Sequence, residues 1–184
     1  KDKAGISSKW VEMIKQSMVK IGPRFTTRRM INDYLRQYYL PMFDHFKTIR
    51  NDNFKKLNEL CEWKQKIVAN WSSIKVMDMT LYDSANKALP MGDDFHAEIA
   101  LSLGNLKPDE IGIEVLLTQK KDQNAVKEVI YKQEFKVKDS NRSRTMYEVS
   151  FPVTQSGVFE YGFRIFPKHT LLPNKMDFNL IKWV

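Results

Sequence analysis

The chain of 184 residues contains a single cysteine, Cys61, and only seven glycines, none of them next to another. One cysteine excludes an internal disulfide and is typical of a reducing compartment, so we expect a cytoplasmic protein. Because Cys61 lies on an apolar helical stripe, we expect its thiol to be buried. The isolated glycines exclude a glycine-rich phosphate-binding loop.

Motifs for metal binding and catalysis are also missing. His45, His96 and His169 are far apart in the sequence, so we expect no metal site. Paired carboxylates occur at Asp93-Asp94 and Asp109-Glu110, but both pairs lie in turn-rich segments, which favours solvated turn residues over an acid–base pair. The sequence therefore identifies no catalytic, cofactor-binding or metal-binding residue.

Long hydrophobic runs are absent, and none approaches the roughly 20 residues that a membrane-spanning helix needs, so we expect no membrane partner. With 42% hydrophobic and 28% charged residues, the composition is that of a globular protein. The first residue is Lys1 and not methionine, and we expect that a part of the polypeptide precedes it.

Positive charge is unevenly distributed along the chain. The net charge is +8, and the whole excess lies in residues 1–72, with 15 Lys+Arg against 7 Asp+Glu, whereas residues 73–184 balance 15 against 15. We favour an acidic surface of the upstream part as the partner of this basic segment. A nucleic-acid-binding protein is a remote alternative, because arginines and aromatic residues alternate in residues 24–39.

Helical periodicity dominates the first 72 residues. Apolar side chains recur at a 3.6-residue spacing over residues 8–21, and Gly22-Pro23 predicts the end of that helix. A second helix is predicted to start at Thr26 or Thr27, both good N-cap residues, and Pro41 predicts a break or a kink.

Two further helical segments follow. One extends through Phe43 and Phe46 to about Ile49, and the next is predicted from Asp52 to Trp71. The latter has two apolar stripes and not one, which predicts two packing partners. The stripes consist of Phe54, Leu57, Cys61, Val68 and Trp71, and of Leu60, Trp63 and Ile67.

Period-two alternation replaces the helical pattern after Trp71. Apolar and polar residues alternate in segments separated by turn signals, which predicts about seven antiparallel strands. The predicted strands are 74–81, 95–103, 111–117, 129–137, 147–153, 159–165 and 178–184. We therefore predict an α+β chain in two parts, a helical segment at 1–72 and an immunoglobulin-like β sandwich at 73–184.

Arg28 and Arg29 occupy the first turn of the second predicted helix, where the helix dipole disfavours cations. An acidic partner is the interpretation that we favour. An anion held at the helix N-terminus is the alternative, so both arginines are candidate anion contacts.

Several motifs resemble α-glucan (glycogen/maltodextrin) phosphorylases, and most closely the bacterial and archaeal branch that carries an extra β domain. In the helical part they are Lys9-Trp-Val-Glu-Met-Ile-Lys-Gln-Ser-Met18, Phe25-Thr-Thr-Arg-Arg-Met30, Asp33-Tyr34 and Tyr38-Tyr39-Leu-Pro41. In the strand part they are Leu103-Gly-Asn-Leu-Lys-Pro-Asp-Glu-Ile-Gly-Ile-Glu-Val115, Gly157-Val-Phe-Glu-Tyr-Gly-Phe-Arg164, Pro167-Lys-His169 and Leu180-Ile-Lys-Trp183.

The resemblance implies that residues 1–72 are the closing helices of a GT-B-type catalytic lobe. The implied parent enzyme uses pyridoxal phosphate to cleave α-1,4-glucan with phosphate, releasing glucose 1-phosphate. The family's cofactor-lysine motif is absent from this chain, so we expect no cofactor here, an inactive accessory fragment, and the upstream lobes as its partner. The alternative is a carbohydrate-binding or docking sandwich, with α-glucan as ligand and Trp71 and Trp183 as candidate stacking residues.

Overall fold

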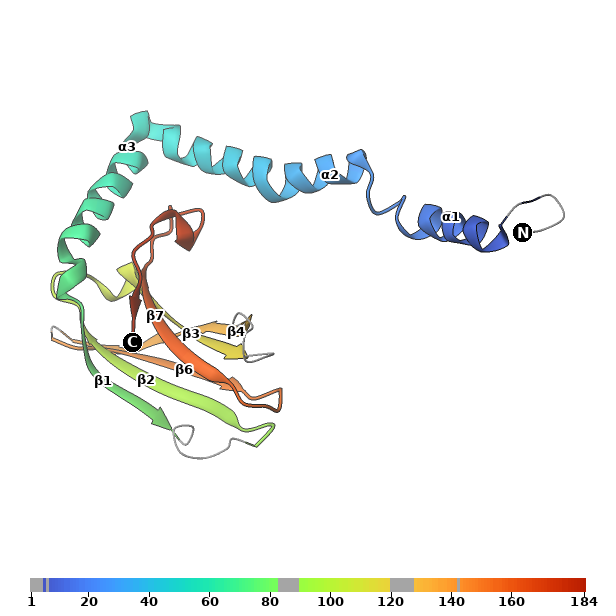
Figure 1. Cartoon of the computed structure of the whole chain (residues 1–184). Helices are drawn as coiled ribbons and strands as arrows, with labels where there is room; N and C mark the ends of the chain where they lie inside the picture. The colour runs from blue at the N-terminus through green and yellow to red at the C-terminus, as the bar shows by residue number, and fades with distance from the viewer. Residues whose placement is uncertain (1–4, 6, 83–89, 120–127, 142) are drawn as a thin grey trace. The chain divides into compact units, whose positions relative to one another are not determined.

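The computed structural model describes residues 5, 7–82, 90–119, 128–141 and 143–184 (Figure 1). The chain divides into two compact units, residues 1–56 and residues 57–184. The predicted boundary at residue 72 follows the change from helical to strand sequence. The division by packing lies earlier, because the last turns of a helix belong to the core of the second unit.

The first unit begins with two helices at the predicted places, α1 (Ser8–Lys20) and α2 (Thr27–Tyr34). The Thr26 hydroxyl accepts a hydrogen bond from the backbone N–H of Arg29 (3.3 Å), which confirms Thr26 as the N-cap of α2. Both helices lie open to solvent, and none of the described residues between 7 and 56 is buried.

Pro41 follows a π-helical turn, η1 (Leu35–Tyr39), and stands in the first turn of α3 (Leu40–Asn70). A proline inside a helix has no N–H to donate, and its ring clashes with the carbonyl four residues earlier. The wider π turn is one way to relieve that clash. The predicted disturbance at Pro41 therefore takes the form of a local change of helical pitch.

Helix α3 is interrupted between Asn51 and Phe54, where the predicted third and fourth helical segments meet. Asp52, Asn53 and Phe54 have φ angles of 53°, 53° and 62°, in the left-handed region. Asp and Asn tolerate this conformation because their short polar side chains bond locally, whereas a phenylalanine there is strained.

Beyond this kink, α3 buries one of its two predicted stripes. Leu60, Trp63 and Ile67 are 6%, 7% and 0% exposed and belong to the sandwich core. The other stripe is mostly exposed, with Val68 59% exposed, although Trp71 at its end packs partly buried against the core. Cys61 is also exposed, so the expectation of a buried thiol was wrong, because the helix turns the opposite stripe to the strands.

The strands form two four-stranded antiparallel sheets packed face to face (Figure 1). In the first sheet the order is β1 (Lys75–Tyr82), β2 (Asp94–Ser102), β6 (Thr145–Pro152) and β5 (Lys136–Ser140). In the second it is β4 (Glu128–Glu134), β3 (Ile111–Gln119), β7 (Glu160–Pro167) and β8 (Lys182–Trp183). Short 3-10 turns η2 (Trp71–Ser73), η3 (Pro108–Glu110) and η4 (Lys175–Asp177) connect the elements.

The predicted strand 129–137 is in fact two strands that belong to different sheets. The chain crosses between them at Phe135, which is 5% exposed and donates its backbone N–H to the Ile113 carbonyl (2.8 Å). The polar interruption at Gln133 came just before this crossing. The last predicted strand, 178–184, is reduced to β8, because the segment before it packs through side chains against the core.

Helix α3 and the C-terminal segment close one end of the sandwich together. The Trp63 ring lies 4.6 Å from the His169 ring and 5.6 Å from the Phe178 ring, measured between centroids. Beside them, the Lys66 ammonium bonds both carboxylate oxygens of Glu110 (2.8 and 2.7 Å). Within the described residues, no helix is both long enough and apolar enough to cross a membrane.

Replacing Ile67 with alanine is expected to lower the free energy of unfolding by about 2–5 kcal/mol, because it removes all the side-chain carbons beyond Cβ from a fully buried site. Val68→Ala, one residue away on the exposed side, is the matched control, with an expected change within about 0.5 kcal/mol. Urea unfolding followed by strand circular dichroism measures both. Equal effects of the two substitutions would show that α3 does not pack on the strands.

Candidate functional site

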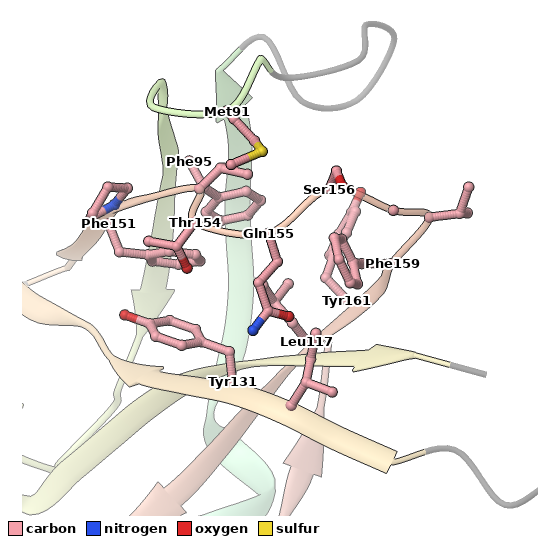
Figure 2. Close-up of a pocket in the computed structure, with 15 residues that line it drawn as sticks. Met91, Phe95, Leu117, Tyr131, Phe151, Thr154, Gln155, Ser156, Phe159 and Tyr161 are labelled. Carbon is pink, nitrogen blue, oxygen red and sulfur yellow. The ribbon is translucent and has the colours of Figure 1, made fainter. Parts of the chain in front are cut away.

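A cavity of about 560 Å³ opens at the end of the sandwich where β2 begins and β6 ends (Figure 2). One wall comes from β2 and β6, where Phe95 and Phe151 are register partners. The facing wall comes from β4, β3 and β7, where Leu117 is paired with both Tyr131 and Tyr161. The segment 152–159 forms the rim.

The aromatic rings of the cavity hold one another in place. Phe95 and Phe151 are each 5% exposed and stacked, with centroids 4.9 Å apart and an angle of 22° between the planes. The Tyr131 ring lies 4.6 Å from that of Phe151, and the Tyr161 ring 6.1 Å from that of Phe95. Tyr131 and Tyr161 are 37% and 42% exposed, so each presents ring surface to solvent over a buried aromatic base.

The rim is held by backbone hydrogen bonds and needs a glycine. The Val153 N–H donates to the Asp93 carbonyl (2.9 Å), and the Gly92 N–H donates to the Val153 carbonyl (3.0 Å). Gly157 has a φ of +148°, and a side chain there would meet the Phe159 ring at 3.1 Å. In Figure 2 the Gln155 side chain extends from the rim into the cavity.

The described residues that line the cavity carry no charge. Its polar groups are the hydroxyls of Thr154, Ser156 and the two tyrosines, and the Gln155 amide. The sequence alone did not predict this site, because its aromatic residues come from four strands. Within its own strand, each is an ordinary apolar position of an alternating pattern. The Gly157-to-Tyr161 motif is the local signal that marks its rim.

A second group of polar side chains lies on the outer face of the first sheet. His96 and Glu98 are two residues apart on β2, Glu148 on β6 is the register partner of Glu98, and their ligand atoms lie within 4.8 Å of one another. Such a set has the donors of a metal site. However, a bulge in β5 directs Lys138 to the carboxylates, where its ammonium bonds Glu98 and lies 3.3 Å from Glu148.

This ion-pair arrangement shifts the ionisation of Glu98. The hydrogen bond from Lys138, aided by that from the Tyr82 hydroxyl (3.3 Å), lowers the pKa of the Glu98 carboxyl below its usual range. The same contacts with Glu98 and Glu148 raise the pKa of Lys138. The strand spacing of His96 and Glu98 was the sequence signal for this group. The expectation of no metal site stays a prediction.

Two other polar groups brace the fold. Glu114 is 2% exposed and is bonded by Arg164 and Lys175, so its buried charge is compensated. The Tyr147 hydroxyl donates to the Pro108 carbonyl (3.1 Å), and burial, with a smaller effect of Asp109, raises the pKa of Tyr147.

The paired carboxylates of the sequence serve no common site. Asp93, Asp94 and Asp109 are exposed, as expected for turn residues. Glu110 differs, because its carboxylate accepts from Lys66 and from the Lys107 backbone N–H (2.7 Å) and therefore ties η3 to α3. Its expected role as a solvated turn residue was wrong.

The candidate anion contacts, Arg28 and Arg29, belong to the first unit, whereas the cavity is formed by the second. Arg29 pairs with Asp33 one turn later (3.3 Å) and lies over the Phe25 ring (5.7 Å), so an acidic neighbour offsets its charge in the first turn of α2. Arg28 makes no ion pair with any described residue. An anion at this helix end stays a prediction.

The two tryptophans considered for sugar stacking also lie outside the cavity lining. Trp71 packs partly buried against the core. Trp183 is 61% exposed on β8 and rests against Gly162, where a side chain would meet its ring at 3.5 Å.

The second unit is thus a β sandwich of two four-stranded antiparallel sheets, with the last turns of α3 packed into its core. The sequence profile of the glycogen phosphorylase C-terminal domain matches residues 71–184. The chain belongs to this family, which confirms the resemblance seen in its motifs.

Similar proteins extend the match into the helical part. A maltodextrin phosphorylase of Thermococcus litoralis is 27% identical over 180 residues, covering 96% of this chain and 20% of that protein. A glycogen phosphorylase of Mycobacterium tuberculosis is 20% identical over 181 residues, covering 98% of this chain and 21% of that protein. A glycogen phosphorylase of Aquifex aeolicus is 38% identical over 39 residues, or 21% of this chain and 6% of that protein. The chain thus spans about a fifth of the length of its first two relatives.

The lowered pKa of Glu98 predicts a pH-dependent contribution to stability. A carboxyl whose pKa is lower in the folded state stabilises the fold above its unfolded pKa of about 4.3, and this contribution is lost as the pH falls through the folded value. Glu98→Gln is therefore expected to lower Tm at pH 7 and to have a much smaller effect near pH 3.

The control for this measurement is Asp78→Asn on the same sheet. Asp78 is 61% exposed and pairs with Arg144 at 3.6 Å, so its loss should change Tm little at either pH. Calorimetric Tm values between pH 3 and 8 decide the question. A Tm loss for Glu98→Gln that is the same at both ends would contradict the assignment.

Proposed function

We propose that this chain is the C-terminal, accessory part of an α-glucan phosphorylase and that it contributes no catalytic group of its own. The proposal is carried by one observation. A phosphorylase C-terminal domain profile covers residues 71–184, and relatives named phosphorylases align with nearly the whole chain although the chain is only a fifth of their length. The described residues form no acid–base pair in a cavity, which supports the same assignment.

We further propose that the upstream lobes of the same polypeptide cover residues 8–54. Large apolar side chains are exposed throughout residues 8–54, and together they leave more apolar surface open to water than a soluble helical segment usually carries. They include Trp10 58%, Met18 69%, Phe25 74%, Ile31 49%, Tyr39 63% and Phe43 53%. The excess of basic residues in the same segment favours an acidic surface on the partner.

We also propose a fold class for the helical unit and for the sandwich. A GT-B-type lobe would be completed by the helices of the first unit. The sandwich is assigned to the immunoglobulin-like class on its strand order, since β1-β2-β6-β5 opposite β4-β3-β7-β8 repeats the ABED and C′CFG arrangement. The class's tyrosine corner does not support it, because Tyr161, near the start of β7, is 42% exposed.

Cofactor chemistry is assigned to the upstream part. Pyridoxal phosphate needs a lysine for its aldehyde and donors for its phosphate. The described residues that line the cavity include neither a lysine nor an arginine, so they do not fit this cofactor. A cytoplasmic location is proposed on the cysteine content, because the only cysteine is free and exposed.

The chain by itself is expected to release no glucose 1-phosphate from glycogen and inorganic phosphate. Coupled detection of glucose 1-phosphate, with the full-length polypeptide as the positive control, measures this. Turnover by the purified 184-residue chain that survives further purification would overturn the accessory role.

The docking of the helical segment is tested by one substitution in two contexts. Ile31→Asp changes an exposed side chain in the 184-residue chain, so the free energy of unfolding should change by less than about 0.5 kcal/mol. In the full-length polypeptide the same change places a charge in a buried contact and should cost more than about 2 kcal/mol. Thermal and urea unfolding of both proteins give the two values.

Asn32→Asp is the matched control, because it adds the same charge on the neighbouring, polar side of α2. It should be nearly neutral in both contexts. An Ile31→Asp effect that is equally small in the chain and in the full-length polypeptide would show that the upstream lobes do not cover α2.

A further inference from the structure

We propose that the cavity at the open end of the sandwich is a glucan-binding subsite, which takes a short neutral segment of α-1,4-linked glucose. The inference rests on the proposed function for the identity of the sugar. It rests on the cavity itself for the class of ligand, a neutral molecule with apolar faces and hydroxyl edges.

The tyrosine rings of the cavity provide surfaces for the flat faces of a sugar. A pyranose ring presents C–H groups on its flat faces, and aromatic side chains are the surfaces that bind such faces. Tyr131 and Tyr161 are both partly exposed, and each is the register partner of Leu117 on the strand between them. Two aromatic rings therefore lie on the same face of one sheet. The buried rings of Phe95 and Phe151 pack against the two tyrosines and restrict their side chains. A ligand therefore has less side-chain freedom to remove when it binds.

The polar groups select against charge. Sugar hydroxyls bind hydrogen-bond donors and acceptors, and the described lining supplies neutral ones in the Thr154 and Ser156 hydroxyls and the Gln155 amide. An anionic ligand would find no cation among the described lining residues, and a cationic ligand would find no carboxylate. A volume of about 560 Å³ lies within the roughly 300–1,000 Å³ of known ligand pockets.

A purely apolar ligand fits the lining less well. It would make no hydrogen bond with the Gln155 amide or with the serine and threonine hydroxyls, whereas a sugar hydroxyl can bond each of them. The choice of an α-1,4-glucan over other neutral sugars follows from the relatives, which are named maltodextrin and glycogen phosphorylases.

The subsite predicts a role in the handling of long chains. A glucan held at the sandwich raises the local concentration of the same chain at a catalytic cleft elsewhere in the polypeptide. The gain applies only to glucans long enough to reach both places. Short maltooligosaccharides would occupy the sandwich without this benefit.

The test is calorimetric titration of the 184-residue chain with maltoheptaose. Saturable binding is expected, and Tyr131→Ala and Tyr161→Ala should each weaken it about tenfold or more, as truncation of an aromatic anchor commonly does. Tyr131→Phe keeps the ring face and should bind within about threefold of the parent chain, since stacking needs the ring and not the hydroxyl.

Trp183→Ala is the matched control, because it removes an exposed aromatic ring from the outer side of the same sheet. It should leave binding unchanged. Loss of binding in Trp183→Ala but not in Tyr131→Ala would overturn the assignment and place the sugar on the outer face. Gln155→Ala, an exposed rim substitution, tests the site independently of any strand variant that fails to fold.

Absence of maltoheptaose binding at millimolar sugar would overturn the proposal. So would competition in which an uncharged apolar dye such as Nile red occupies the cavity and maltoheptaose does not displace it. Either failure is distinct from failure of the proposed function, because the contrast of Ile31→Asp between the isolated chain and the full-length polypeptide does not involve the cavity.

Discussion

The contact between the last turns of α3 and the β sandwich is the constraint on which the second unit depends. Leu60, Trp63 and Ile67 bring apolar surface from a helix into a core that is otherwise made by strands. The C-terminal segment then packs on the same helix through His169 and Phe178, so both ends of the sandwich sequence converge on Trp63. Without α3, this end of the core would face water, at a cost of about 25 cal/mol for each Å² of apolar surface exposed.

The helical segment before the kink obeys a different rule. Its helices carry apolar stripes as strong as that of α3, yet none of the described residues from 7 to 56 is buried. Isolated helices of 8–13 residues are marginal in water, because packing of an apolar face supplies most helical stability in proteins. Their exposed apolar faces are the basis of the proposal that the upstream lobes of the same polypeptide cover these helices.

The sequence predicted the local structure well where one period held over a whole element. Helices α1 and α2 and strands β2, β3, β6 and β7 lie close to their predicted places. It failed where the outcome depended on neighbours distant in sequence. Alternation could not show that Phe135 passes from one sheet to the other, since both sheets need an inward residue there. Likewise, the presence of two apolar stripes on one helix did not show which stripe would pack on the strands and which, with Cys61, would face solvent.

The same limit applies to the functional groups, because local rules identify only residues that are close in the sequence. Arg28 and Arg29 could be singled out from a local rule about helix ends, and the structure pairs Arg29 with a residue on the same helix. The aromatic cavity could not, because Phe95, Tyr131, Phe151 and Tyr161 meet only through strand pairing across both sheets. The group around Glu98 had a partial signal in the spacing of His96 and Glu98, but Glu148 and Lys138 joined it through register and a bulge.

The two ends of the sandwich are available for different tasks because the strands separate them. Strand β2 begins at the cavity with Phe95 and ends near α3, where Ser102 pairs with the first residue of β1. Seven residues of strand span roughly 23 Å. A ligand at Phe95 and Tyr131 therefore leaves the contact of α3 with the core unchanged. The sandwich can therefore be held by α3 at one end while a ligand occupies the cavity at the other, as the proposed glucan subsite requires.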